Sequence, residues 1–156
     1  MDGIVPVAIA LGSNLGDRER SLRQAVAALA PSIPDLRVST FHETDPVGVA
    51  PQPRFLNAAA IGHTTLPART LLDTMLEIER KFGRRRPHPG APRTLDLDLI
   101  LYGDVVIDES RLTVPHPRFR DRGFVLEPLG EIAADWIDPV TGRTVGELLR
   151  ELAGRP

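Results

Sequence analysis

The chain has 156 residues, a formal net charge of −2 and no cysteine. Its length allows one compact domain with a hydrophobic core, so we expect a single domain over residues 1–156. The lack of cysteine excludes disulfides and thiolate-bound zinc, and the near-neutral charge argues against a disordered chain or a general nucleic-acid binder. No apolar stretch reaches membrane-spanning length and the N-terminus does not resemble a secretory signal, so we expect a cytoplasmic protein without a membrane partner.

The apolar pattern predicts elements in the order βαββαβ, followed by a C-terminal extension. Strands are predicted at 5–11, 36–42, 55–64 and 95–102, with a short fifth strand at 105–107. Helices are predicted at about 17–29 and 67–83, and two shorter ones near 126–134 and 145–152. This order favours an α+β sandwich, in which helices pack on one face of a mainly antiparallel sheet.

Two carboxylates stand out in the apolar run that follows the second predicted helix. Asp96 and Asp98 are two residues apart, and because a strand alternates its faces both should point the same way. Oxygen ligands without His or Cys nearby favour a hard cation such as Mg²⁺. The alternative is a pair of solvent-facing strand residues in surface salt bridges. The opposite face should be buried in the core, through Leu95, Leu97, Leu99 and Leu101.

Basic residues gather in two places near this strand. The stretch 80–93 has no Asp or Glu and is rich in Pro and Gly, which predicts either a lid over an anionic ligand or simply a solvated loop. A second cluster lies next to His116, the histidine best placed to touch phosphate. The basic residues of the two clusters are Arg80, Lys81, Arg84, Arg85, Arg86 and Arg93, and then Arg118, Arg120 and Arg122.

The strand at 55–64 combines an aromatic ring and an amide on one predicted face. Phe55 and Asn57 could stack on and hydrogen-bond to a flat heterocycle, although a core Phe and an Asn that satisfies backbone groups are the plainer interpretation. For Phe124, too, stacking on a heterocycle and a position in the core both stay open. A phosphate loop of the Walker A type is excluded, because no Gly-Lys-Ser/Thr occurs in the sequence.

Five stretches share an order and spacing typical of one family: ALGSNLGD at 10–17, RFLNAA at 54–59, IERKFGR at 78–84, PRTLDLDLILYG at 92–103 and LTVPHPRFRDRGFVLEPL at 112–129. Together they resemble the 6-hydroxymethyl-7,8-dihydropterin pyrophosphokinase family of the folate pathway. The resemblance implies a ferredoxin-like fold. It also implies transfer of the β,γ-pyrophosphoryl group of ATP to the hydroxymethyl oxygen of the reduced pterin, with release of AMP.

The resemblance also assigns residues to the phosphates and metal. Asp96 and Asp98 match carboxylates that bind two Mg²⁺ ions, and Arg84 and Arg93 match arginines in and beside a flexible loop that hold phosphates and close the site. These four residues are the expected catalytic set. Further ATP-contacting positions are Glu79, His116 and Arg122.

The pterin positions follow from the same resemblance. Phe55 and Phe124 match an aromatic pair that sandwiches the pterin ring. Thr44 and Asn57 match residues that hydrogen-bond to its amide-like edge, and the backbone around Val47 assists them. We expect ATP and the reduced pterin as the only partners of a monomeric enzyme, with no nucleic acid.

The chain departs from the family pattern in the basic loop, where Gly90 stands in place of a tryptophan found in many relatives. Two other functions compete with the pyrophosphokinase. A non-catalytic nucleotide- or RNA-binding module is disfavoured by the Asp96 and Asp98 pair, which would repel the RNA backbone. A metal-dependent phosphohydrolase would need a group that activates water, and the sequence offers no poised candidate.

Overall fold

The computed structural model describes residues 3–44, 54–82 and 95–155. A five-stranded sheet forms the centre of the protein. Four of its strands follow the order β2-β4-β1-β5, and the fifth, β3, pairs with a different part of β4 than β2 does. All of its pairings are antiparallel. The strands of this sheet are β1 (Val5–Ser13), β2 (Arg37–Val38), β3 (His42–Thr44), β4 (Phe55–Thr64) and β5 (Asp96–Tyr102).

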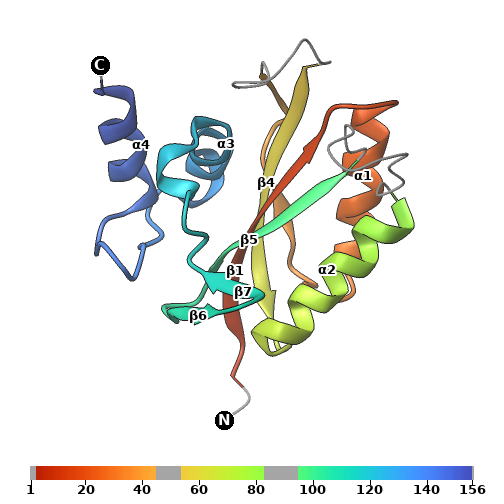
Figure 1. Cartoon of the computed structure of the whole chain (residues 1–156), viewed down its shortest axis with the longest axis horizontal. Helices are drawn as coiled ribbons and strands as arrows, with labels where there is room; N and C mark the ends of the chain where they lie inside the picture. The colour runs from red at the N-terminus through yellow and green to blue at the C-terminus, as the bar shows by residue number, and fades with distance from the viewer. Residues whose placement is uncertain (1–2, 45–53, 83–94, 156) are drawn as a thin grey trace.

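Helices cover both faces of the sheet (Figure 1). The first two helices pack on one face, as the βαββαβ order predicts, and the C-terminal extension covers the other face, which the expectation of helices on one face did not include. The larger core lies between the sheet and the first pair of helices, and the second core lies under the extension. The helices are α1 (Arg18–Leu29), α2 (Ala68–Phe82), α3 (Gly123–Ala133) and α4 (Val145–Ala153), with a short 3₁₀ turn η1 (Phe119–Asp121).

The fold confirms the predicted α+β class and its ferredoxin-like strand order. The two strands of each βαβ unit are separated by one strand of the other unit. Strand β4 therefore lies beside β1, and all neighbouring strands of the sheet are antiparallel. Helix α1 is capped by Asp17, whose side chain accepts the backbone N–H of Arg20 at 3.1 Å. None of the helices in the described ranges is long and apolar enough to cross a membrane.

Two strand predictions are wrong in detail. The strand predicted at 36–42 is split into β2 and β3, because the Ser39 hydroxyl accepts the Ala59 N–H at 2.9 Å and interrupts the ladder. The strand predicted at 105–107 is displaced toward the C-terminus. Gly103 turns with φ +56°, Val105 is still in the turn, and β6 (Ile107–Glu109) pairs with β7 (Leu112–Val114) in a separate hairpin.

Leu101 does not belong to the leucine row that was predicted from alternation. Leu95, Leu97 and Leu99 lie in the larger core, as expected, whereas Leu101 lies in the second core with Ile100. The pairing explains this, because Ile9 is opposite Leu99 while its neighbour Ala8 is opposite Leu101. One extra residue in β5 forms a β-bulge, which reverses the facing of every later side chain.

The C-terminal extension is fastened by a buried ion pair. The Asp138 carboxylate is fully buried between α3 and α4 and accepts Nη2 of Arg120 at 2.9 Å, in addition to Nε. The hydroxyl of Thr141 and the N–H of Val140 complete its hydrogen bonds, at 2.7 and 3.0 Å. Although burial raises it, these bonds hold the pKa of Asp138 below its ordinary value.

Replacing Asp138 by alanine should lower the free energy of unfolding by about 3–5 kcal/mol at pH 7, because Arg120 would keep a desolvated charge without its partner. The contribution of Asp138 is present above its ordinary pKa of about 3.9 and is lost as the pH falls through its lowered pKa in the folded protein. Urea denaturation of both proteins from pH 7 toward pH 2 measures this. A difference that stays constant over that range would contradict the assignment.

Candidate functional site

The candidate site is built on three strands whose side chains line up across the sheet. Asn57 on β4, Gly12 on β1 and Asp96 on β5 are directly opposed, so they share one face. The next row on that face consists of Ala59, Ala10 and Asp98. With strands about 4.8 Å apart, Asn57 and Asp96 are roughly 10 Å from each other. Asn57, the amide predicted to bind the pterin, and the Asp96 and Asp98 pair predicted to bind metal thus lie at two ends of one surface.

Gly12 separates these two ends, and sequence analysis did not identify it. A Cβ atom at this position would lie 3.1 Å from Oδ1 of Asn57, which is closer than side chains normally approach. The other row has only the methyl group of Ala10 at the same place. Small residues on alternate positions of β1 are the sequence signal that could have found this floor, since they keep bulky groups away from the space between Asn57 and the carboxylates.

Replacing Gly12 by alanine should raise the KM for the pterin by about fivefold. The new methyl group would push the Asn57 amide from its place, and the loss of one well-aligned hydrogen bond is worth about 1 kcal/mol. Steady-state kinetics with each substrate varied in turn measures this. The matched control is Gly3→Ala, because an added Cβ at Gly3 meets nothing within 4 Å. Equal kinetics for the two variants would show that Gly12 has no role in the site.

His116 lies at the carboxylate end of this surface. Its Nε2 is 4.0 Å from Oδ1 of Asp98, and its Nδ1 accepts the backbone N–H of Arg118 at 3.2 Å. Burial and the nearby charges of Arg122 and Arg118 lower the pKa of His116, against an opposing effect of Asp96. The lowered pKa favours the neutral imidazole, and the Arg118 N–H on Nδ1 favours the tautomer with its proton on Nε2, where it can donate to a phosphate oxygen.

Glu79 contacts the metal strand through its backbone. The side chain is only 3% exposed, and its Oε2 accepts the N–H of Leu97 at 2.7 Å. Strand β5 is at the edge of the sheet, so this N–H has no neighbouring strand on its outer side. Glu79 thus joins α2 to the residue between Asp96 and Asp98. A contact of Glu79 with ATP stays a prediction.

The pterin end is defined by three of the predicted residues. The side chain of Asn57 is 5% exposed and donates Nδ2 to the hydroxyl of Thr44 at 2.6 Å. Thr44 is directly opposite Phe55, whose ring is half-buried at the start of β4. The bond to Thr44 uses one hydrogen of the Asn57 amide, which leaves its second N–H and its carbonyl oxygen to recognise a ligand.

Arg122 and Phe124 lie at the start of α3, the helix that packs over the face of the sheet carrying Asn57. The guanidinium of Arg122 lies over the Phe124 ring, 5.5 Å from its centroid. Helix α3 packs on the face of β4 that carries Asn57, as the second core shows. That the rings of Phe55 and Phe124 sandwich the pterin stays a prediction.

Arg120 is not a free phosphate ligand, although it was included in the basic cluster with Arg118 and Arg122. Its guanidinium forms the buried pair with Asp138 described above. It also lies over the ring of Phe119, 4.9 Å from the centroid. The partner is 18 residues away in sequence, so local charge counting could not reveal it.

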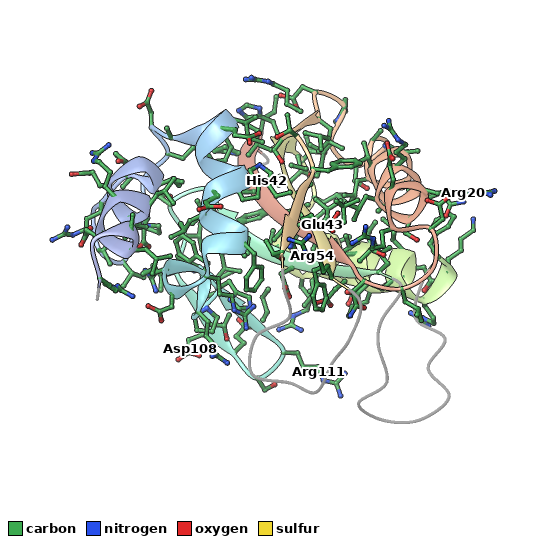
Figure 2. All side chains as sticks on the ribbon, turned by 90° about the horizontal axis from the view of Figure 1, so that it is seen from above. Arg20, His42, Glu43, Arg54, Asp108 and Arg111 are labelled. Carbon is green, nitrogen blue, oxygen red and sulfur yellow. The ribbon has the colours of Figure 1, made fainter. Side chains whose placement is uncertain are left out.

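Several predicted site residues lie outside the described residues, namely Val47, Arg84, Gly90 and Arg93. The flanks of the segment that contains Val47 are described. Glu43 pairs with Arg54 at 3.0 Å and with Arg18 at 3.3 Å, and Figure 2 shows Glu43 and Arg54 side by side. Glu43 and Arg54, which lie on either side of residues 45–53 in the sequence, are therefore held together next to Thr44.

The two carboxylates of β5 fit a magnesium site. Asp96 and Asp98 lie on one face, both are partly exposed, and their ligand atoms are all oxygen. Within the described part of the chain no group of three or more His, Cys, Asp or Glu gathers around a common point. A cation here would keep water and take oxygens from a substrate, as Mg²⁺ does with phosphates.

The fold and the site together define an α+β protein with an amide, two aromatic rings, a carboxylate pair and an imidazole gathered at one surface of its antiparallel sheet. A profile of the 7,8-dihydro-6-hydroxymethylpterin-pyrophosphokinase family matches residues 8–134. The chain is 48% identical over 126 residues to the 2-amino-4-hydroxy-6-hydroxymethyldihydropteridine pyrophosphokinase of Bacillus subtilis, covering 80% of this chain and 75% of the relative. It is 43% identical over 146 residues to the protein of the same name from Synechocystis, covering 92% and 74%.

Solved structures agree in fold. Wild-type HPPK-DHPS of Plasmodium falciparum superposes with a TM-score of 0.78 at 12% identity, over 97% of this chain and 45% of that one. This chain thus spans less than half of that solved protein. The chain belongs to the 7,8-dihydro-6-hydroxymethylpterin-pyrophosphokinase family, as the family profile and the bacterial relatives show.

Proposed function

We propose that the surface from Asn57 to Asp98 is the active site for the reaction of this family. The chain is an ATP-dependent diphosphotransferase of folate biosynthesis: it transfers pyrophosphate from ATP to the hydroxymethyl group of 6-hydroxymethyl-7,8-dihydropterin. The observation that carries the site assignment is the row formed by Asn57, Gly12 and Asp96. It offers an amide for the ring edge and a carboxylate for the charged end, with open floor between them.

The residues divide the work between the two substrates. Asn57 and Thr44 orient the pterin edge, and Phe55 with Phe124 contact its faces. Asp96 and Asp98 would hold two Mg²⁺ ions, which when bound would neutralise phosphate charge and lower the pKa of the attacking hydroxyl. His116 donates from Nε2 to a phosphate oxygen, and Arg122 supplies a fixed positive charge beside it.

The remaining assignments rest on the sequence. Arg84 and Arg93 hold the phosphates and close the site, Glu79 contacts the nucleotide, and the backbone at Val47 binds the pterin edge. The protein acts as a cytoplasmic monomer without a nucleic-acid partner. Its oligomeric state can be measured by sedimentation equilibrium at micromolar concentration, where a dimer would contradict this part of the proposal.

Product analysis tests the reaction directly. We expect that the enzyme incubated with ATP, Mg²⁺ and the reduced pterin releases AMP in a 1:1 ratio to pyrophosphorylated pterin. Omission of the pterin is the control, and it should abolish AMP release. ADP as product would indicate transfer of a single phosphoryl group, and ATP cleavage without pterin would indicate a phosphohydrolase.

A further inference from the structure

Asp138 is the most completely hydrogen-bonded carboxylate in the described residues that the proposed site does not use. It is fully buried, in the connection between α3 and α4. Four donors surround its two oxygens: Nε and Nη2 of Arg120, the Thr141 hydroxyl and the Val140 N–H. A carboxylate with every acceptor position filled is a rigid anchor, because it can neither rotate nor take another partner without losing a bond.

The anchor fixes the middle of the segment that carries His116 and Arg122. Arg120 lies in η1, and its guanidinium is held against the ring of Phe119, which is fully buried in the second core. The pair of bonds from Nε and Nη2 is a fork that fixes direction as well as distance. Arg120 is thereby held in one direction, although it lies in a short turn whose next residue, Asp121, is exposed.

One end of the segment depends on that middle. The N–H of His116 donates to Ile100 O of β5 at 3.0 Å, and the N–H of Arg122 donates to Phe119 O at 3.2 Å. The N–H of Phe119 donates to His116 O at 3.3 Å. His116 thus has its own tie to the sheet, whereas Arg122 is placed through the η1 turn that Arg120 secures.

We propose that Asp138 is a positioning residue for ATP, which acts through Arg120 to hold η1 so that Arg122, beside His116, faces the phosphates. The inference rests on the proposed function of these two residues. It gives the C-terminal extension a task in nucleotide binding, although α4 itself lies on the far side of α3 from the sheet (Figure 1). The pterin end should be much less affected, because Asn57 and Thr44 are held by bonds within the sheet and Phe124, although close to Arg122, also packs against the second core.

The test compares substrate constants in Asp138→Asn, which keeps the shape of the side chain and removes its charge. We expect the KM for ATP to rise about tenfold and the KM for the pterin to stay within twofold, at a temperature where circular dichroism shows both proteins folded. A merely structural role would lower the thermal midpoint and leave both constants of the folded fraction unchanged. That result would overturn the proposal, as would an equal rise in both constants.

Variants of Arg120 keep the proposal testable even where Asp138→Asn folds poorly. Arg120→Met should reproduce the rise in the KM for ATP, and Arg120→Lys, which keeps the charge but lacks the fork, should lie between it and the parent. The double variant Arg120→Met with Asp138→Asn should be no worse than either single variant, because both remove one contact. Additive effects would overturn the shared mechanism.

Two further variants separate this inference from the site assignment. Arg155→Met breaks the exposed pair of Arg155 with Asp121, on the same turn, and should leave both constants unchanged. Arg122→Met tests whether the segment contacts ATP. If Arg122→Met raises the KM for ATP and Asp138→Asn does not, the positioning role is wrong while the site stands. If neither has an effect, the assignment of this segment to ATP is wrong as well.

Discussion

Asp98→Asn should lower turnover by about 10²–10³-fold at saturating ATP, pterin and Mg²⁺. The substitution keeps the size of the side chain and removes one of two carboxylates that share a face of β5. Loss of a metal ligand removes the charge stabilisation on which phosphoryl-type transfer depends, and removal of a single preorganised electrostatic group commonly costs 10²–10³-fold. Single-turnover quench-flow measurement isolates the chemical step from product release.

The matched control is Asp108→Asn, because Asp108 is an exposed aspartate on the separate β6 hairpin (Figure 2). It should leave turnover unchanged. The thermal midpoint of each variant is measured beside that of the parent, so that a loss of turnover is not mistaken for a loss of structure. Near-normal turnover of Asp98→Asn at high Mg²⁺ would sink the metal assignment.

Asn57→Leu should lower kcat/KM for the pterin by about 10²-fold. The Asn57 amide is buried and already bonded to Thr44, so its free N–H and carbonyl oxygen are fixed in direction before the substrate arrives. Loss of two such bonds to a substrate costs about 2–3 kcal/mol, and leucine in addition leaves polar atoms of the pterin edge without partners. The KM for ATP should stay within about twofold.

Isothermal titration with each substrate separates this effect from a general loss of structure. Pterin affinity should fall in Asn57→Leu, while the affinity for an ATP analogue in the presence of Mg²⁺ should be retained. A variant that loses both affinities together would show that Asn57 supports the fold rather than the ring edge. A variant that keeps both affinities would show that the pterin does not bind at this end of the sheet.

Local alternation was enough to predict much of the site. The strand Phe55–Thr64 has the bounds that the sequence predicts, and Asp96 and Asp98 share a face as a period of two requires. Asn57 also lies on the predicted face with Ala59, which belongs to the second core. These features depend only on near neighbours in the chain, so no long-range contact was needed to foresee them.

The errors come from contacts that no local pattern records. Leu101 faces the second core because β5 has one more residue than β1 between matching pairs, and that insertion is visible only when the two strands are aligned. The sequence also did not predict which face of the sheet the C-terminal extension covers. Helix α3 follows the βαββαβ unit, and its position depends on which face of the sheet the first two helices leave uncovered.

Roles assigned to charged residues were the least predictable. Arg120 has the same local surroundings in sequence as Arg118 and Arg122, but it is bound to Asp138 through a contact formed only in the folded protein. Glu79 is nearly buried and holds the backbone of Leu97, which the resemblance alone did not indicate. Charge predicts where ligands are attracted, whereas burial decides which charges are still available to bind them.

The position of an isotopic label in the product tests the central claim most directly. ATP carrying ³²P at the β-phosphorus is incubated with the enzyme, Mg²⁺ and 6-hydroxymethyl-7,8-dihydropterin, and the nucleotide and pterin fractions are separated. Transfer of pyrophosphate across the Asp96 and Asp98 end of the site predicts that the label appears in the pterin fraction and that the nucleotide product is unlabelled AMP. Label retained in ADP, with an unlabelled pterin fraction, would contradict the account.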